Sequence, residues 1–580
     1  MKNAAPSPEA SPAVRARIPN APVNRTMLAS AGMAALSTAI WTRSGDSVAG
    51  FACSAVTGVL AAVCLKHGYT MMVRDYRLRF GVAVSRLVSR DHGSARQSTW
   101  QERAARGMDS YRHGQLFGLD DEGKAVWRPK DAFLTLTEMP PGVGKTSTLV
   151  IGSILHYARL GRSLIIPDVK AELGVMLAPH LRRLGYEVWC LNAAGENVGI
   201  TGNVEVGLYQ AFIDALYGDE QERKRAIKIA ADLAALHHPM TNEEKNPYFG
   251  LGSRRMIILA ILVCGFLDPA NCTPTRVYEL LTDPALCLRI CRKIQSFESV
   301  IKNDRVLDDL KREARNALHR AAKNEENFAS FLEGASQKFM SFNPSGMLGN
   351  YGAGAIHSLS TIRERQVIVF IITPLSSMRE FSDYITLINH GIVAAVKSKP
   401  DGHPIHIVGE EALNYRFHDL VADLETPRQL GVTIDLYIQS FDGLALHYGK
   451  QAAAAIESYA EVRIYAGLNN QDRLKRVSEM LSEATVRRQE VSYQETVNHL
   501  GISSRELGRP VMKPNEVGAM PKGQAWMFVN GLHPVRLTML SYAQVFPWRD
   551  EVDPSPITVT RLYAPAVLHV DYDAGGRDGT

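Results

Sequence analysis

Short apolar runs separated by helix-like stretches recur along most of this 580-residue chain. The runs are rich in β-branched residues, as expected for strands buried on both faces. They span residues 132–137, 163–166, 187–191, 367–372, 405–408, 433–438 and 462–465. Because strands alternate with helical stretches, the pattern predicts an α/β fold with a mostly parallel sheet covered by helices.

Between residues 208 and 345 the apolar positions recur at helical spacing instead. The expected helices cover Arg254–Leu267, Thr275–Leu281, Val306–Lys323 and Ala329–Phe342. This pattern predicts an all-α domain inserted between a first α/β part, residues 74–207, and a second, residues 346–546. After residue 547 the chain contains several Pro, Asp and Gly residues, which predict a loose tail to residue 580.

The N-terminal region carries two apolar runs without charges, Met27–Trp41 and Val48–Leu65, joined by a short turn. Residues 1–26 before them are rich in Pro and Ala and are expected to be disordered. A signal peptide would have its apolar run closer to the start. A buried helical hairpin is an alternative, and we favour a two-span transmembrane hairpin over residues 27–73.

Basic residues flank the predicted hairpin on both sides, with Arg15, Arg17 and Arg25 before it and Lys66 and Arg74 after it. The positive-inside rule then places both termini and the bulk of the chain in the cytoplasm. A membrane that the chain crosses twice is the expected location.

The amino-acid composition excludes few classes of protein. Hydrophobic residues make up 46% and charged residues 22% of the chain, as in ordinary folded proteins. The net charge of +5 permits an anionic partner without requiring one. The seven cysteines lack zinc-type spacing, and we interpret them as reduced packing residues.

The stretch MPPGVGKT, residues 139–146, resembles a phosphate-binding loop. The signature G-x-x-x-x-G-K-[ST] is complete except that Met139 stands at the first glycine. A predicted strand precedes the loop and a predicted helix, Ser147–Leu160, follows it, so free N–H groups would point at a bound phosphate. A Gly/Pro turn that happens to contain Lys-Thr is the alternative. The expected nucleotide contacts are Gly142, Val143, Gly144, Lys145, Thr146 and Ser147.

A phosphate loop also needs an acid for magnesium and a group that activates water. Glu410 and Glu411 follow the strand at 405–408, and we expect Glu410 to bind the metal with Thr146 and Glu411 to polarise water. The alternative is two solvated glutamates. Gln439 ends the next strand and could contact the γ-phosphate, and Arg428 could reach a neighbouring subunit or simply end a helix.

These pieces, in this order, resemble the type IV secretion coupling proteins, the membrane ATPases of conjugation. The resemblance covers about residues 27–544. It rests on the N-terminal hairpin, the phosphate loop and the following stretches: IIPDVKAELGV, HHPMTNEEKNPYFGLGSRRMIILAIL, IHIVGEEALNYR, LETPRQLGVTIDLYIQSFDGLALHYGK, RIYAGLNNQDRLKRVSEML and RPVMKPNEVGAMPKGQAWMFVNGLHPVRL.

The resemblance implies a RecA-like P-loop NTPase domain, ATP with Mg2+, and a homohexamer in the bacterial inner membrane. It also implies delivery of a relaxase–DNA complex or effector proteins to the channel proteins of a type IV secretion system. Asp168 and Lys170 match a family motif, Asp-x-Lys-Gly-Glu-Leu, whose chemistry the sequence does not reveal; a strand-end turn is the alternative.

Three departures from the family pattern leave the activity open. Met139 replaces a glycine, Glu410 an aspartate, and Ala171 the glycine of the Asp-x-Lys-Gly-Glu-Leu motif. The chain is therefore expected to be an ATP hydrolase, with Met139 and Glu410 as the features that could lower its rate. A nucleotide-binding substrate receptor with little hydrolysis and a chromosome-segregation DNA translocase are the competing functions.

Overall fold

The structure is a computed structural model, and it describes residues 25–44, 47, 49–50, 52–67, 95–240, 247–298, 304–410, 430–494 and 499–572. The chain divides into two compact units. One comprises Met1–Ser94 and Glu483–Arg509, and the other Ala95–Ser482 and Pro510–Thr580. The strands β10 (Glu483–Gln494) and β11 (His499–Pro510) pair only with each other. This hairpin therefore interrupts the second α/β part, which was expected to run without a break from 346 to 546.

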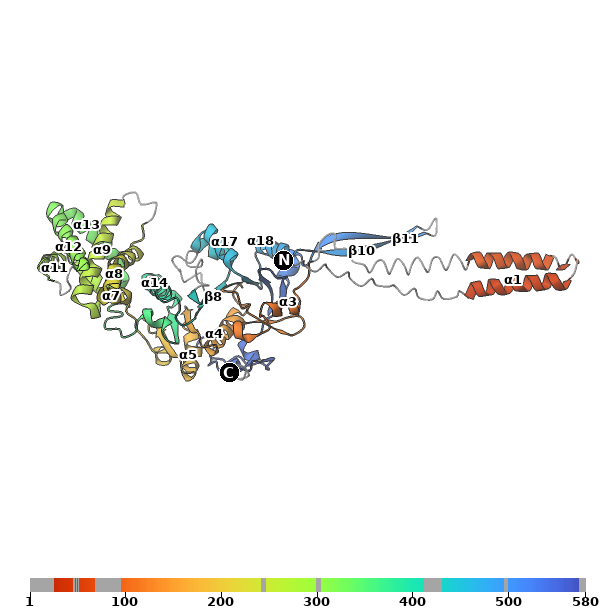
Figure 1. The fold of residues 1–580 in the computed structure, drawn as a ribbon, viewed down its shortest axis with the longest axis horizontal. Helices are drawn as coiled ribbons and strands as arrows, with labels where there is room; N and C mark the ends of the chain where they lie inside the picture. Colours follow the sequence, from red (N-terminus) through yellow and green to blue (C-terminus); the bar gives the residue numbers. More distant parts are fainter. Residues whose placement is uncertain are drawn as a thin grey trace, which may run out of the picture. The chain divides into compact units, whose positions relative to one another are not determined.

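An eleven-stranded sheet forms the α/β part of the second unit, in the order β2-β1-β13-β12-β9-β3-β8-β7-β4-β6-β5. Figure 1 labels one of its strands, β8, with helices around it. From β9 to β5 all neighbours run parallel, and β12, β13, β1 and β2 extend the sheet in antiparallel fashion. The seven predicted strands make up the parallel part, so the expected α/β fold is confirmed. The strands are β1 (Leu116–Leu119), β2 (Ala125–Trp127), β3 (Leu134–Glu138), β4 (Ser163–Asp168), β5 (Glu187–Leu191), β6 (Val367–Ile372), β7 (Ile405–Gly409), β8 (Val432–Ile438), β9 (Val462–Tyr465), β12 (Gln524–Val529) and β13 (Val535–Thr538).

The parallel strands are buried on both faces. In β6, Val367 and Val369 belong to one apolar cluster, whereas Ile368 and Phe370 belong to another on the opposite face. This alternation follows from the two-residue period of a strand. Helices therefore cover both faces, the principal ones being α4 (Ile151–Arg159), α5 (Leu173–Arg183), α14 (Ser382–Ser398), α16 (Phe441–Tyr448), α17 (Lys450–Tyr459) and α18 (Gln471–Met480).

A helical region separates β5 from β6 in sequence. Side-chain caps set several helix starts: Asp219 and Glu222 form a capping box on α8, and Thr273 caps α10. One apolar cluster runs from the sheet into these helices, so the helical region shares a core with the sheet. The helices are α7 (Gln210–Tyr217), α8 (Glu220–His237), α9 (Pro247–Leu267), α10 (Pro274–Thr282), α11 (Pro284–Ile294), α12 (Arg305–Lys323) and α13 (Glu325–Ser336).

The C-terminal segment, residues 547–572, folds onto α4 instead of forming the loose tail that its composition predicts. Trp548 is buried and packs on Gly152, where a Cβ would lie 2.7 Å from the indole ring. Trp548 Nε1 donates to Tyr572 Oη at 3.0 Å, and Tyr572 Oη lies 2.8 Å from His156 Nδ1. The prediction was wrong for these residues because two aromatic anchors fix a segment that contains several Pro and Asp residues.

Two helices, α1 (Arg25–Ser44) and Ala52–His67, lie where the transmembrane hairpin was predicted. Ser37 Oγ on α1 donates to Ser54 O at 2.8 Å, so these helices contact each other. By length and apolar composition, one helix among the described residues could cross a bilayer, and it is α9. Because 67% of the most apolar 18-residue stretch of α9 is buried inside the protein, α9 resembles the core helix of a folded domain. The helix Ala52–His67 is apolar but shorter.

Candidate functional site

The loop between β3 and α4 turns on two glycines. Gly142 and Gly144 have φ values of +78° and +102°, a region that glycine adopts without steric cost. Met139 needs no such freedom: its side chain is fully buried, and its N–H donates to Ile438 O at 2.9 Å. Met139 therefore continues β3 beside β8, which explains how the fold tolerates the missing first glycine.

The loop leads into a single π-helical turn, Thr146–Val150, before α4. Ser147 Oγ and Thr148 Oγ1 donate to Gly144 O at 3.0 and 2.9 Å, which fixes the turn. The loop opens onto a pocket of about 790 Å³. Of the six predicted contacts, Gly142, Gly144, Lys145, Thr146 and Ser147 line this pocket, and the Val143 side chain packs into the core.

Thr146 and Glu410 meet at the mouth of the loop although they are far apart in sequence. Thr146 Oγ1 donates to Glu410 Oε1 at 2.5 Å. Glu410 is 7% exposed, and its burial raises the pKa of its carboxyl despite the opposing effects of Thr146, Lys145 and Lys170. The meeting follows from the sheet, because β3 and β7 flank β8 and all three end at the same edge.

A magnesium ion fits this pair of oxygens. Mg2+ prefers hydroxyl, carboxylate and phosphate oxygens, and it is usually held by one or two carboxylates with the substrate phosphates. Within the described part of the chain no cluster of three His, Cys, Asp or Glu could hold a metal. Thr146 and Glu410 would therefore hold magnesium together with a phosphate ligand.

Gln439 follows β8 and lines the same pocket as Lys145 and Thr146. Glu411 and Arg428, the predicted water-activating base and arginine finger, lie outside the described residues, so their roles stay predictions. The structure thus brings six of the predicted site residues, from two separate segments, to one pocket, and Glu410 contacts one of them, Thr146.

Asp168 closes the turn between β4 and α5. Its Oδ1 accepts the Glu172 N–H at 3.0 Å and its Oδ2 accepts the Gly174 N–H at 2.8 Å. Ala171 has a φ of +51°, which explains why the family pattern has glycine here. Asp168 therefore holds a strand-end turn, and that turn brings Lys170 to a small cavity of about 10 Å³ that Glu410 also lines.

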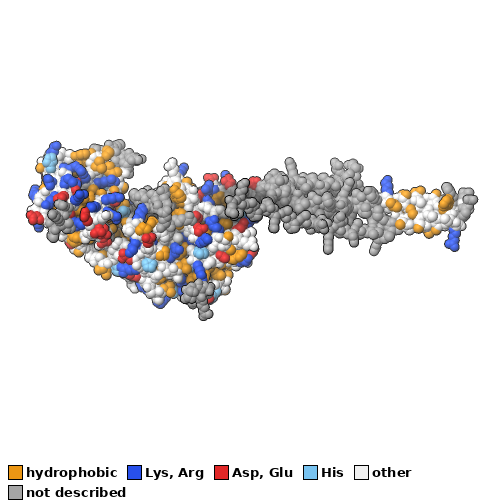
Figure 2. Space-filling model, viewed as in Figure 1, with side chains coloured by type: hydrophobic (Ala, Val, Ile, Leu, Met, Phe, Trp, Pro, Cys, Tyr) orange, Lys and Arg blue, Asp and Glu red, His pale blue; other side chains and the backbone are white. Residues whose placement is uncertain are grey.

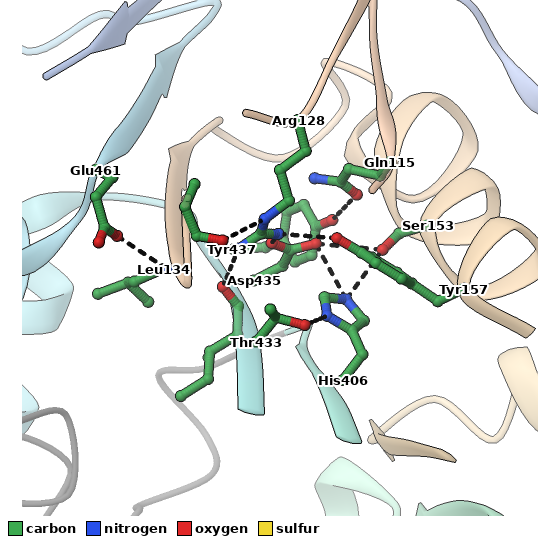
Figure 3. A network of polar contacts seen from close by, with 12 residues as sticks. Gln115, Arg128, Leu134, Ser153, Tyr157, His406, Thr433, Asp435, Tyr437 and Glu461 are labelled. Atoms are coloured by element: carbon green, nitrogen blue, oxygen red, sulfur yellow. Dashed lines mark hydrogen bonds and ion pairs between the residues drawn. The ribbon is translucent and has the colours of Figure 1, made fainter. Parts of the chain in front are cut away.

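A buried charged network surrounds Asp435 in the middle of β8 (Figure 3). Arg128 Nη1 pairs with Asp435 Oδ1 at 2.5 Å, and both side chains are fully buried. Asp435 Oδ2 lies 3.2 Å from both His406 Nε2 and Ser153 Oγ. Burial alone would raise the Asp435 pKa, but Arg128 and His406 outweigh it and hold that pKa well below its usual range.

This network joins the three elements that carry the candidate site. Ser153 lies on α4 after the loop, His406 on β7 before Glu410, and Asp435 on β8 before Gln439. Sequence reasoning missed it, because a charged residue inside an apolar strand has no local partner. The signal available was Asp435 itself, within the apolar run 433–438.

Acid should destabilise the protein through His406. Burial lowers its pKa to about 4, against about 6.5 in an unfolded chain. Between these values only the unfolded state takes up the proton, so stability falls as the pH falls; Asp435 stays ionised throughout. We expect His406 to contribute a loss of about 2 kcal/mol between pH 6.5 and 5.

The measurement is the urea midpoint as a function of pH, compared between the wild type and His406→Gln. The variant should be less stable overall but should show a shallower decline on acidification. An equal decline in both proteins would contradict this assignment.

A second buried ionic cluster lies at the start of the loop. Glu138, the last residue of β3, accepts the Phe441 N–H at 3.0 Å and pairs with Arg473 at 2.6 Å. Arg473 also pairs with Glu457 at 2.8 Å and stacks over Phe441, 4.5 Å from its ring centre. The cluster ties the start of the loop to the chain that follows Gln439, and no local sequence pattern predicted it.

The sequence profile of a family described as "Type IV secretory system Conjugative DNA transfer" matches residues 93–552. A search of curated proteins finds no match. Among solved structures, an unbound form of the bacterial conjugative coupling protein TrwB gives a TM-score of 0.52 at 13% identity, covering 76% of this chain and 91% of that one.

Two further similar structures contain ligands. TrwB with ADP and Mg2+ gives a TM-score of 0.50 at 12% identity, covering 75% of this chain and 91% of the other. TrwB with the ATP analogue ADPNP gives 0.51 at 12% identity, covering 77% and 93%. At such identities the similarity is one of fold.

Proposed function

The chain belongs to the type IV secretory system family of conjugative DNA transfer, and from this premise we propose that it is a coupling ATPase. It recruits a relaxase–DNA complex or effector proteins and delivers them to the channel proteins of a type IV secretion system. The contact that carries this proposal is the one between Thr146 and Glu410. With Lys145 and Gln439 in the same pocket, it assembles the parts of a nucleotide site.

Each residue has a separate task in this proposal. The loop N–H groups and the Lys145 ammonium hold the β- and γ-phosphates. Thr146 and Glu410 hold magnesium, which when bound neutralises charge on the phosphates. Glu411 orients and polarises the attacking water, Gln439 contacts the γ-phosphate, and Arg428 reaches the site of a neighbour in a homohexamer.

ATP is the nucleotide that the pocket is proposed to take. TrwB structures contain ADP with Mg2+, or the ATP analogue ADPNP, in a protein of the same fold. Met139 and Glu410 are the two departures that favoured a receptor with little hydrolysis. Met139 continues β3 and leaves both loop glycines with positive φ values. This favours the hydrolase over the receptor.

We expect the chain to hydrolyse ATP with magnesium, and single-stranded DNA to stimulate the rate. Glu411→Gln should lower it about 10²–10⁴-fold, because an amide cannot accept the proton of water. Glu410→Asp, the matched control, should retain or raise it, because residue 410 only holds the metal. Steady-state phosphate release measures all three proteins.

Two outcomes would contradict the hydrolase. Equal small effects of both substitutions would show that neither glutamate acts in hydrolysis. Wild-type protein that binds ATP but releases no phosphate, with or without DNA, would be the nucleotide-binding receptor instead.

The N-terminal helices are proposed as the membrane anchor. Their apolar side chains lie on the surface, including Leu36, Trp41, Val59 and Val63, each at least 55% exposed. Figure 2 shows hydrophobic side chains on the outside of these helices, with few charged ones among them. Burial of such side chains in acyl chains removes them from water, which is the driving force for insertion.

The anchor is tested by flotation with phospholipid vesicles. The full chain should float with the vesicles and need detergent for extraction, whereas a chain beginning at residue 95 should stay in the soluble fraction. Full-length protein that is soluble without detergent would place the hairpin in a protein interface instead.

A further inference from the structure

The pocket at the phosphate loop extends well beyond the loop. Its volume of about 790 Å³ is in the range of sites for whole organic ligands, which is more than phosphates alone occupy. Its lining includes Gly144, Lys145 and Thr146 of the loop and, from the C-terminal segment, Thr558, Arg561 and Tyr563. Part of the pocket wall therefore comes from a distant part of the chain.

The C-terminal segment is held to both helices that border the pocket. Trp548 packs on Gly152 of α4. The Asp553 N–H donates to Met176 O of α5 at 3.0 Å, and Ser555 Oγ donates to Glu172 Oε1, just before α5, at 2.6 Å. These contacts place the wall at the pocket without any bound ligand.

The side chains of this wall suit a nucleoside rather than a phosphate. Tyr563 is 78% exposed, and the Arg561 guanidinium lies 5.9 Å from its ring centre. Arg561 is itself fixed, because its Nη2 donates to Arg549 O at 2.5 Å. Tyr542 and Leu562 line the same pocket beside Tyr563.

We propose that residues 558–563 form the nucleoside subsite of this pocket, in which Tyr563 stacks on the base of the bound nucleoside triphosphate. The exposed ring offers a face to a planar base, and stacking of this kind tolerates any base. The hydroxyls of Thr558 and Thr560 line the same wall and can bond the ribose. This inference rests on the proposed nucleotide site and adds the residues that bind its non-phosphate half.

The test compares two probes, a fluorescent ATP analogue labelled on its terminal phosphate and inorganic tripolyphosphate, each with magnesium. Tyr563→Ala should weaken the ATP analogue about tenfold or more, because loss of one stacking partner has an effect of that size. Tripolyphosphate affinity should stay unchanged, and Tyr563→Phe should bind the analogue like the wild type. The control is Tyr459→Ala, an exposed tyrosine at the end of α17.

Each other result overturns the proposal. Normal binding of the ATP analogue by Tyr563→Ala would show that the ring does not touch the base. Equal losses for the analogue and tripolyphosphate would show that the segment acts on the loop rather than on the nucleoside. Wild-type protein that binds neither probe would remove the proposed nucleotide site itself.

Discussion

Replacing Lys145 with alanine is expected to abolish nucleotide binding and leave the fold intact. The side chain is 9% exposed and sits in the loop that lines the pocket, where its ammonium would meet the β- and γ-phosphates. A hydrogen bond between charged groups contributes about 1.5–3 kcal/mol, so losing two such contacts should lower affinity at least about a hundredfold. Titration with a labelled ATP analogue measures the loss.

Lys130→Ala is the matched control for that experiment. Lys130 is an exposed lysine before β3, whereas the phosphate loop follows the opposite end of that strand. Its removal should leave the titration unchanged, and circular dichroism should be the same for both variants. Undiminished binding by Lys145→Ala would show that this loop is a Gly/Pro turn and not a phosphate site.

Asp435→Asn is expected to lower the free energy of unfolding by about 3–5 kcal/mol. The change removes the charge that pairs with Arg128, which has no solvent exposure. A buried guanidinium without its carboxylate keeps its desolvation penalty and loses its compensation. Urea denaturation measures the effect. Because the network joins α4, β7 and β8, we also expect the variant to lose ATP hydrolysis at urea concentrations that the wild type tolerates.

Glu220→Gln provides the comparison for Asp435→Asn. Glu220 pairs with Lys224 at 2.8 Å, but its side chain is 86% exposed, and water screens such a pair. The urea midpoint of this variant should match that of the wild type. If Asp435→Asn also leaves the midpoint in place, the buried network does not stabilise the fold.

The parallel strands and the phosphate loop could be predicted because their signals are local. A strand that is buried on both faces is apolar throughout, as in residues 367–372. A loop that needs positive φ values has glycines at those positions, here Gly142 and Gly144. The carboxyl ends of parallel strands share an edge of the sheet. The polar residues after 405–408 and 433–438 could therefore be placed near the loop from the sequence alone. The structure brings Glu410 and Gln439 there.

The four antiparallel strands gave weaker signals. They are short, and β12 and β13 join the sheet beside β9 after a hairpin that lies in the other unit. The C-terminal segment was missed for a related reason. Its average composition is that of a tail, and its place is set by Trp548 and Tyr572 meeting α4.

By itself, then, the sequence determined the alternation of strands and helices, the phosphate loop and the acid that faces it, because each depends on neighbouring residues or on strand direction. Only the tertiary structure decided which distant charges meet. Arg128 pairs with Asp435, 307 residues further along the chain, and Glu138 pairs with Arg473, 335 residues further along. The tertiary structure also decided that Thr558 and residues 560–563 line the pocket. Contacts between residues so far apart in sequence depend on how the sheet orders its strands, and no local pattern of side chains records that order.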